Sequence, residues 1–271
     1  MRRTHRPIME SRNSVRMVLL GKTGTGKSAS GNTILGRDAF LSGNNLNPVT
    51  PSSSIEETQL GGRTVSVVDT PGFYDTTLSE AALAEELGRS VYLSRPGLHA
   101  FLYVMPVNQR FTQQEFEVAQ QLFKVFGNEV SKYTIVLFTH GDDRPQNLSD
   151  QISKNKYLSS FIQQCGGRYH VFNNKERNRE QVTGLLEMID RVVTQNEGSY
   201  YTSELFTRAN RSTWANFWDG LKKFFQFAIA AMRAVYLMAQ TLNDAAMHVK
   251  KFLECDEVIQ FSQAWLAIYG S

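Results

Sequence analysis

The chain has 271 residues, of which 41% are hydrophobic, and its formal net charge at pH 7 is +3. This apolar content is enough for a sizeable core, which excludes a chain that is disordered throughout. So small a net charge gives no reason to expect nucleic acid as a partner. Two cysteines, Cys165 and Cys255, are too few for a disulfide framework, so we expect an intracellular protein.

The first residues, 1–13, are basic and polar. They lack the apolar core of a secretory signal peptide, so they give no indication of export. Because chain ends are usually solvated, we expect residues 1–13 to form a disordered basic tail.

A short apolar run, Val15 to Leu20, is rich in branched residues and stops at a glycine. This is typical of a strand that is buried in a parallel sheet. A glycine-rich loop follows at once, and residues 27–35 then have the pattern of a helix, with Gly36 as its expected end. The predicted order is therefore strand, loop and helix.

The next part of the chain alternates between strand and helix patterns. A stretch dense in Asn, Ser, Gly and Pro, 41–54, predicts a flexible loop. Apolar runs predict strands at 64–68, 99–105, 133–139 and 168–172, and apolar residues three and four positions apart predict helices at 79–93, 112–126, 149–164 and 179–194. This alternation is typical of a doubly wound α/β domain, with a mostly parallel sheet and helices on both faces, over residues 14–200.

Strand patterns cease after this domain, and residues 201–271 are predicted to form a helical C-terminal extension. From Leu221 onward, apolar residues recur at the spacing of one wide helical face. Such a helix packs on the domain, pairs with another chain or lies in a membrane interface, and packing on protein is the commonest of these. A membrane-spanning helix over 224–242 is disfavoured, because Arg233 would lie at its centre.

The glycine-rich loop matches the phosphate-binding pattern GxxxxGK[ST] at every fixed position. In this pattern backbone N–H groups surround the phosphates of a nucleotide, the lysine reaches the outer phosphates, and the Ser or Thr hydroxyl binds Mg²⁺. Lys27 is thereby also a catalytic candidate, and Ser28 is a candidate metal ligand. The residues expected to bind nucleotide here are Gly21, Lys22, Thr23, Gly24, Thr25, Gly26, Lys27, Ser28 and Ala29.

A second motif, Asp69-Thr70-Pro71-Gly72, follows the predicted strand 64–68. In P-loop proteins a carboxylate at this place serves Mg²⁺, and a backbone N–H nearby faces the γ-phosphate. We therefore expect Asp69 to serve the metal and Gly72 to approach the phosphate. In the loop before this strand, Thr50 is the candidate for the threonine that closes over Mg²⁺, with Ser52 as the alternative.

A third motif, Thr139-His140-Gly141-Asp142-Asp143, follows the predicted strand 133–139. Guanine presents two N–H donors on one edge that a single carboxylate can accept, so an Asp here distinguishes a GTPase from an ATPase. Counted as Thr-His-x-Asp, the motif assigns this role to Asp142, whereas counting from the strand assigns it to Asp143. The first count is preferred, and His140 and Gly141 would then lie beside the base.

Together these motifs resemble the AIG1 family of GTPases of immunity-associated proteins, the GIMAP group, which belongs with the septin-like and chloroplast-import GTPases. The family's phosphate-loop and DTPG motifs match in full, whereas its base motif, usually Thr-Arg or Thr-His followed by a Lys-acid pair, here contains Gly141. The resemblance covers about residues 14–200 and rests on the segments GKTGTGKSASGNTILG, VVDTPGFYD, SRPGLHAFLYV, RFTQQE, IVLFTHGDD, CGGRYHVFNNK and YYTSELF.

The resemblance implies that Asn173 and Asn174 lie beside the base and that Ser42 approaches the nucleotide. It also implies slow turnover by an isolated chain, because the family lacks a catalytic glutamine after DTPG and Phe73 stands there. Related GTPases dimerise across the nucleotide face. Arg110 corresponds to the family's candidate for stabilising the transition state from the partner subunit, an effect of about 10³ to 10⁵ in rate.

Three functions are consistent with these motifs. The preferred one is a GTPase that binds GTP or GDP with Mg²⁺, dimerises with itself or with related family GTPases, and hydrolyses GTP slowly with help from a partner-subunit arginine. The alternative is a non-hydrolysing, GTP-gated scaffold that acts through its C-terminal helices at membranes or partner proteins, and an ATPase is the third. The expected location is the cytoplasm, with the cytosolic face of an internal membrane as the alternative.

Overall fold

A computed structural model describes residues 13–42, 53–72, 80–176, 178–202 and 204–206 of the chain. The chain divides into two units, Met1–Arg211 and Ser212–Ser271, and all described residues belong to the first. The helix predicted from Leu221 onward, and nearly all of the tail predicted at 1–13, lie outside the described residues. None of the helices that the structure describes is long and apolar enough to cross a membrane.

A six-stranded sheet forms the centre of the domain, with the strand order β2-β3-β1-β4-β5-β6. Strand β2 runs antiparallel to β3, and the other neighbouring strands are parallel. The strands are β1 (Ser14–Leu20), β2 (Ser54–Leu60), β3 (Arg63–Asp69), β4 (Ala100–Pro106), β5 (Thr134–Thr139) and β6 (Tyr169–Val171).

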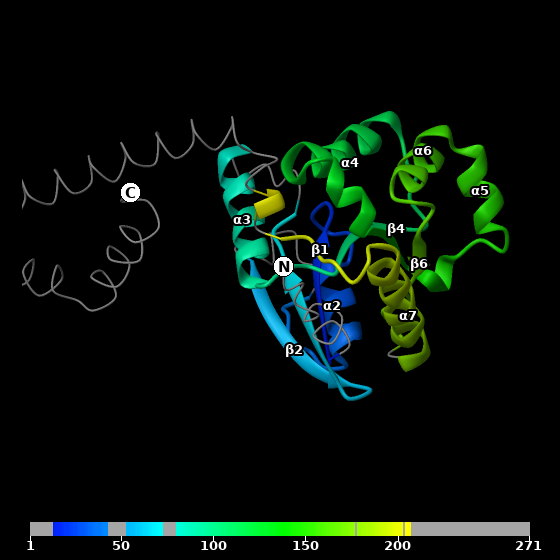
Figure 1. The fold of residues 1–271 in the computed structure, drawn as a ribbon. Helices are drawn as coiled ribbons and strands as arrows, with labels where there is room; N and C mark the ends of the chain where they lie inside the picture. The colour runs from blue at the N-terminus through cyan, green and yellow to red at the C-terminus, as the bar shows by residue number, and fades with distance from the viewer. Residues whose placement is uncertain (1–12, 43–52, 73–79, 177, 203, 207–271) are drawn as a thin grey trace, which may run out of the picture. The chain divides into compact units, whose positions relative to one another are not determined.

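Helices cover both faces of this sheet (Figure 1). They are α2 (Lys27–Leu35), α3 (Glu80–Leu93), α4 (Gln113–Phe126), α5 (Leu148–Lys154), α6 (Lys156–Gln164) and α7 (Arg179–Gln195), with short 3₁₀ helices η1 (Asn128–Tyr133) and η2 (Gly141–Asp143). The predicted doubly wound α/β fold is therefore confirmed.

The core lies around the central strands, where every residue of β4 and β5 is buried. Strands that are covered on both faces need apolar side chains at consecutive positions, which explains the unbroken apolar runs of the sequence. The carboxyl ends of β1, β3, β4 and β5 meet at one edge of the sheet because these strands are parallel. All the predicted site motifs follow one of these strands or β6.

Strand β2 was not predicted from the sequence. Its residues, SIEETQL, are mostly polar, and they form an edge strand that is only partly buried. The strand pairs with β3 across a two-residue turn at Gly61 and Gly62, whose φ angles of 58° and 76° suit glycine. The Gly-Gly pair is the signal by which this hairpin is recognisable.

The helix predicted over 149–164 is two helices, α5 and α6, separated at Asn155. The side chain of Asn155 accepts hydrogen bonds from the backbone N–H groups of Tyr157 and Leu158, both at 3.1 Å. It therefore caps the start of α6, which satisfies amide groups that a helix leaves unpaired at its first turn.

Tyr201 lies near the start of β4, at the end of the sheet opposite to the motifs. It is fully buried, and its hydroxyl donates to the carbonyl of Phe126 at 2.6 Å. Its backbone exchanges two hydrogen bonds of 2.8 Å with Leu98, just before β4. Tyr201 and Phe206, which the sequence pattern assigned to the extension, are thus buried against the α/β domain.

Replacing Tyr201 with alanine is expected to lower the free energy of unfolding by about 3 to 5 kcal/mol, because the ring fills space between Phe101, Phe126 and Tyr133. Tyr201→Phe should cost only about 1 kcal/mol, the value of one hydrogen bond. Urea unfolding measures both. Tyr92→Ala, which removes an exposed ring, is the matched control and should cost under about 1 kcal/mol. Equal losses at positions 92 and 201 would contradict this account.

Candidate nucleotide-binding site

The glycine-rich loop begins where β1 ends and finishes in the first turn of α2. Gly24 and Gly26 have φ angles of 79° and 91°, which side chains rarely allow, so the loop can curl only with glycine there. Gly26 directly precedes the helix. The amide groups at the start of α2 therefore face the interior of the loop, an arrangement that favours anions.

The loop packs closely on the neighbouring strands. A Cβ atom at Gly21 would overlap the carbonyl oxygen of Val104 in β4. The hydroxyl of Thr139, at the end of β5, donates to the carbonyl of Thr25 at 2.9 Å. The loop is thus held over the carboxyl ends of β1, β4 and β5, where ligands of open α/β sheets bind.

Lys27 lies within the loop and is 7% exposed. Its Nζ donates to the carbonyl oxygens of Gly21 and Lys22 at 3.2 and 2.9 Å. The ammonium group is thereby held on the concave side of the loop by the loop's own backbone. An anionic phosphate that enters this concavity would meet a fixed positive charge.

Ser28 and Asp69 come together across the boundary between α2 and β3. The Ser28 hydroxyl donates to Oδ2 of Asp69 at 2.5 Å, and Asp69 is almost completely buried. A hydroxyl and a carboxylate are hard oxygen donors of the kind that Mg²⁺ prefers, so these residues fit the predicted metal. The predicted third ligand, Thr50, and its alternative Ser52 lie outside the described residues.

The DTPG motif contacts the phosphate loop directly. The buried Thr70 hydroxyl donates to the carbonyl of Leu19 at 2.7 Å. A Cβ atom at Gly72 would overlap the backbone N and the side chain of Thr23, so only glycine fits this position without movement. Phe73 directly follows this motif, at the position where the resemblance implies that a catalytic glutamine is absent. It lies outside the described residues.

The third motif turns sharply after β5. His140 has φ 58° and ψ 47°, a left-handed conformation that is uncommon for residues other than glycine. The N–H of Gly141 then donates to the carbonyl of Phe172 at 2.9 Å, and a Cβ atom at Gly141 would come within 3.0 Å of that same oxygen. Close packing on the segment after β6 therefore gives a physical reason for glycine at 141.

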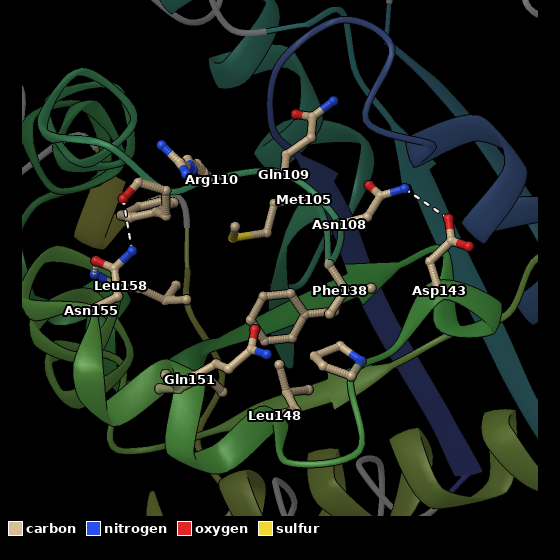
Figure 2. A pocket seen from close by; sticks show the side chains of 14 residues that line it. Met105, Asn108, Gln109, Arg110, Phe138, Asp143, Leu148, Gln151, Asn155 and Leu158 are labelled. Carbon is tan, nitrogen blue, oxygen red and sulfur yellow. Dashed lines mark hydrogen bonds between the residues drawn. The ribbon is translucent and has the colours of Figure 1, made fainter.

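The two aspartates of this motif face different parts of the protein. Asp142 forms an ion pair with Lys175, and the hydrogen bond from this lysine lowers the pKa of Asp142. Asp143 instead accepts a hydrogen bond of 2.8 Å from Nδ2 of Asn108, as Figure 2 shows. Asp142 therefore lies toward the segment after β6, and Asp143 lies toward the loop that follows β4.

The segment after β6 is held between α2 and α7. Asn174 donates to the Ser30 hydroxyl at 3.0 Å and accepts from the Thr33 hydroxyl at 2.9 Å. The N–H of Asn173 donates to Gln181 of α7 at 2.9 Å. The structure thus joins Asn174 to α2 and Asn173 to α7. Ser42 also lies near α2, since its hydroxyl is 3.4 Å from Nδ2 of Asn32.

Arg110 lies in the loop between β4 and α4, at the rim of a cavity of about 310 Å³ (Figure 2). Apolar side chains, among them Met105, Phe138 and Leu148, line part of this cavity, and Asp143 is also at its wall. No residue from 21 to 28 lines it. The arginine side chain is exposed. The cavity therefore adjoins the base motif and not the phosphate loop.

Glu115 also belongs to this region, although its role was not predicted from the sequence. Its Oε1 accepts from Nζ of Lys22 in the phosphate loop at 2.8 Å, and it also bonds Thr112 at the start of α4. Partial burial raises the pKa of Glu115, but the hydrogen bonds from Lys22 and Thr112 outweigh this and lower the pKa to about 2. The Thr-x-x-Glu capping pattern at 112–115 was the available signal.

The fold, the glycine-rich loop and the buried Asp69 together define a P-loop nucleotide-binding domain. Toc33 from Arabidopsis thaliana in complex with GDP and Mg²⁺ is similar in fold, with a TM-score of 0.56 at 19% identity over 69% of this chain and 87% of that one. Era in complex with MgGDPNP and ribosomal RNA is similar too, with a TM-score of 0.51 at 13% identity over 66% and 57%. At these identities the likeness concerns the fold alone.

The sequence pattern of the AIG1 family matches residues 15–219, and the chain belongs to this family. Immune-associated nucleotide-binding protein 9 of Arabidopsis thaliana is 37% identical over 202 residues, which cover 70% of this chain and 58% of the relative. GTPase IMAP family member 8 of Mus musculus is 40% identical over 190 residues, which cover 67% and 28%. The chain therefore spans less than two thirds of the length of these relatives.

Proposed function

We propose that this protein binds GTP and GDP with Mg²⁺ and hydrolyses GTP slowly, at a rate that rises when two copies dimerise across their nucleotide faces. The proposal depends on one observation above all: the phosphate loop, Asp69, the base motif and Asn174 lie at one edge of the sheet, where hydrogen bonds connect them directly or through α2 and the segment after β6. Family membership supports it, since the relatives include GTPases and nucleotide-binding proteins by name.

Phosphate binding is assigned to the loop from Gly21 to Ser28 and to Lys27 in particular. The loop supplies backbone N–H donors, and the buried ammonium supplies the positive charge. Ser28 and Asp69 would hold Mg²⁺, which when bound neutralises charge on the outer phosphates. The residues of the chain thus bind and orient the nucleotide.

Guanine recognition is assigned to Asp142. A carboxylate can accept both N–H groups on one edge of guanine, and Asp142 lies on the same side as Lys175 and the segment of Asn173 and Asn174. Asp143 is engaged with Asn108 on the other side. The two contacts favour Asp142 over Asp143 as the residue that distinguishes guanine from adenine.

Hydrolysis is assigned to a dimer in which Arg110 of one subunit stabilises the transition state in its partner. Its side chain is exposed at the end of the sheet where the motifs gather. Phenylalanine at position 73 cannot orient a water molecule as glutamine does, so an isolated subunit should be slow. For the chloroplast translocon components atToc33 and psToc159, dimerisation is important for GTPase activity, which supports the same arrangement here.

Asp142→Asn is the direct test of guanine binding. The wild-type chain is expected to prefer GTP to ATP in competition with labelled GDP. The variant should bind GTP at least about 100-fold more weakly, because two guanine donors lose their acceptor. It should bind xanthosine triphosphate better than the wild type does, since the asparagine amide can donate to the extra carbonyl of xanthine.

Asp143→Asn is the matched control, because it makes the same chemical change one residue away. Its affinity for GTP should stay within about threefold of the wild-type value. Weakened GTP binding in Asp143→Asn with normal binding in Asp142→Asn would transfer the role to Asp143. Equal affinity of the wild-type chain for ATP and GTP would refute guanine specificity altogether.

A further inference from the structure

The first turn of α4, which directly follows the loop that contains Arg110, is joined to the phosphate loop by an ion pair. Nζ of Lys22, the second residue of the phosphate motif, donates to Oε1 of Glu115 at 2.8 Å. These residues are 93 positions apart in the sequence. The contact therefore connects two motifs that local structure alone would not bring together.

The two carboxylate oxygens of Glu115 contact different residues. Oε2 bonds the backbone N–H and the hydroxyl of Thr112, and the Thr112 hydroxyl in turn caps the N–H of Glu115. This is a complete capping box, which fixes the residue at which α4 begins. Because Oε1 is left for Lys22, a single carboxylate fixes the end of the Arg110 loop and its contact with the phosphate loop.

The loop is also held from its other sides. Asn108 donates to Asp143 of the base motif at 2.8 Å, and Asn155 donates to the carbonyl of Phe111 at 2.9 Å. The Phe111 ring is buried and stacks on Phe161 with centroids 6.1 Å apart. Arg110 is thus an exposed side chain on a loop whose neighbours on both sides are fixed to the nucleotide site.

We propose that Glu115 is a positioning residue: through Lys22 it holds the Arg110 loop at a defined place beside the phosphate loop, so that the arginine reaches the nucleotide of a second copy. This inference rests on the proposed function. Both side chains of the ion pair are about one-third exposed, at 37% and 31%, so its contribution to stability is small. Its effect is geometric, because small displacements of a catalytic group lower the rate strongly.

Glu115→Gln tests the ion pair with Lys22 separately from the capping of α4. Glutamine can also occupy the third position of a capping box, so the start of α4 is retained while the ion pair is lost. The rate of GTP hydrolysis at protein concentrations that saturate dimerisation should fall about tenfold. The dissociation constant for GDP should change by less than about twofold, and the midpoint of thermal unfolding by less than about 2 °C.

Glu117→Gln is the matched control, since it removes the same charge from an exposed position on the same helix. Its rate should equal that of the wild-type chain. The double variant Lys22→Gln with Glu115→Gln should be no slower than Lys22→Gln alone, because the ion pair is already absent.

The outcomes separate this inference from the proposed function. If Arg110→Ala abolishes the concentration-dependent rate but Glu115→Gln leaves it unchanged, the positioning role is wrong and the proposed function stands. If Arg110→Ala has no effect on the rate, the positioning role of Glu115 and the partner-arginine step of the proposed function are both wrong. If Glu115→Gln lowers the unfolding midpoint or the GDP affinity in proportion to the rate, Glu115 is a structural residue only.

Discussion

Replacing Lys27 with alanine is expected to weaken GDP and GTP binding by about 100-fold. The wild-type ammonium is nearly buried and is held by the carbonyls of Gly21 and Lys22, so no rearrangement is needed before it meets a phosphate. Removal of one partner from a buried charged contact costs about 2 to 5 kcal/mol, which corresponds to about 30-fold to several thousand-fold in affinity and includes the expected loss. Titration of the purified chain with a fluorescent GDP analogue measures it.

Thermal and chemical unfolding provide an independent measurement of the same loss. GDP at 100 times the wild-type dissociation constant stabilises the wild-type chain by about 2.7 kcal/mol, whereas a variant with 100-fold weaker binding gains only about 0.4 kcal/mol. Lys132→Ala, which removes an exposed lysine on η1, is the control and should bind GDP as the wild type does. Normal GDP binding by Lys27→Ala would remove the phosphate loop from the proposed site.

The central strands and most helices were predictable from the sequence because their signals are local. A strand covered on both faces, such as β4 or β5, must be apolar throughout, and the run of residues shows this directly. The edge strand β2 lacks such a run, since its stability comes from pairing with β3 and not from burial. The break between α5 and α6 was missed because Asn155 also fits a helical pattern.

The candidate site was predictable from the sequence where short motifs identify its residues. The sequence identified the phosphate loop, Asp69 and the base motif, and the structure places these motifs side by side. Counting along the motif preferred Asp142 and left Asp143 as the alternative, because the contacts in which they differ, with Lys175 and with Asn108, join residues that are distant in the sequence.

Two further features depend on close approach between distant segments. Gly141 departs from the family's usual base motif. The structure explains this, because a Cβ atom at position 141 would lie only 3.0 Å from the carbonyl oxygen of Phe172. Glu115 has a local capping pattern that is visible in the sequence, but its ion pair with Lys22 is not. Motifs therefore locate the parts of such a site, and the packing of strands and helices decides how those parts are connected.

Arg110→Ala is expected to abolish the rise of specific GTPase activity with protein concentration. In the wild-type chain, the activity per molecule should increase as dimers form, because each subunit supplies an arginine to its partner. An arginine in this role contributes about 10³ to 10⁵ in rate, so the variant should be at least about 10³-fold slower where the wild type is dimeric. Its GDP affinity should be unchanged, since the cavity beside Arg110 includes no residue of the phosphate loop.

Two controls sharpen this test. Arg191→Ala removes an exposed arginine from α7 and should leave the rate unchanged. Arg110→Lys should recover little, because a lysine cannot make the bidentate contacts of a guanidinium. If Arg110→Ala hydrolyses GTP as the wild type does while Lys27→Ala loses function, the protein acts as a nucleotide-gated scaffold instead.

The action of Arg110 across the dimer is testable by giving the two subunits different nucleotides. The Asp142→Asn chain has an intact Arg110 and is expected to prefer a xanthosine nucleotide, whereas the Arg110→Ala chain binds GTP but lacks the arginine. Mixing them with GTP and a non-hydrolysable xanthosine nucleotide should restore GTP hydrolysis, because the arginine of one chain then reaches the GTP of the other. Failure to restore hydrolysis, in mixtures shown to contain the mixed dimer, would mean that Arg110 acts within its own subunit.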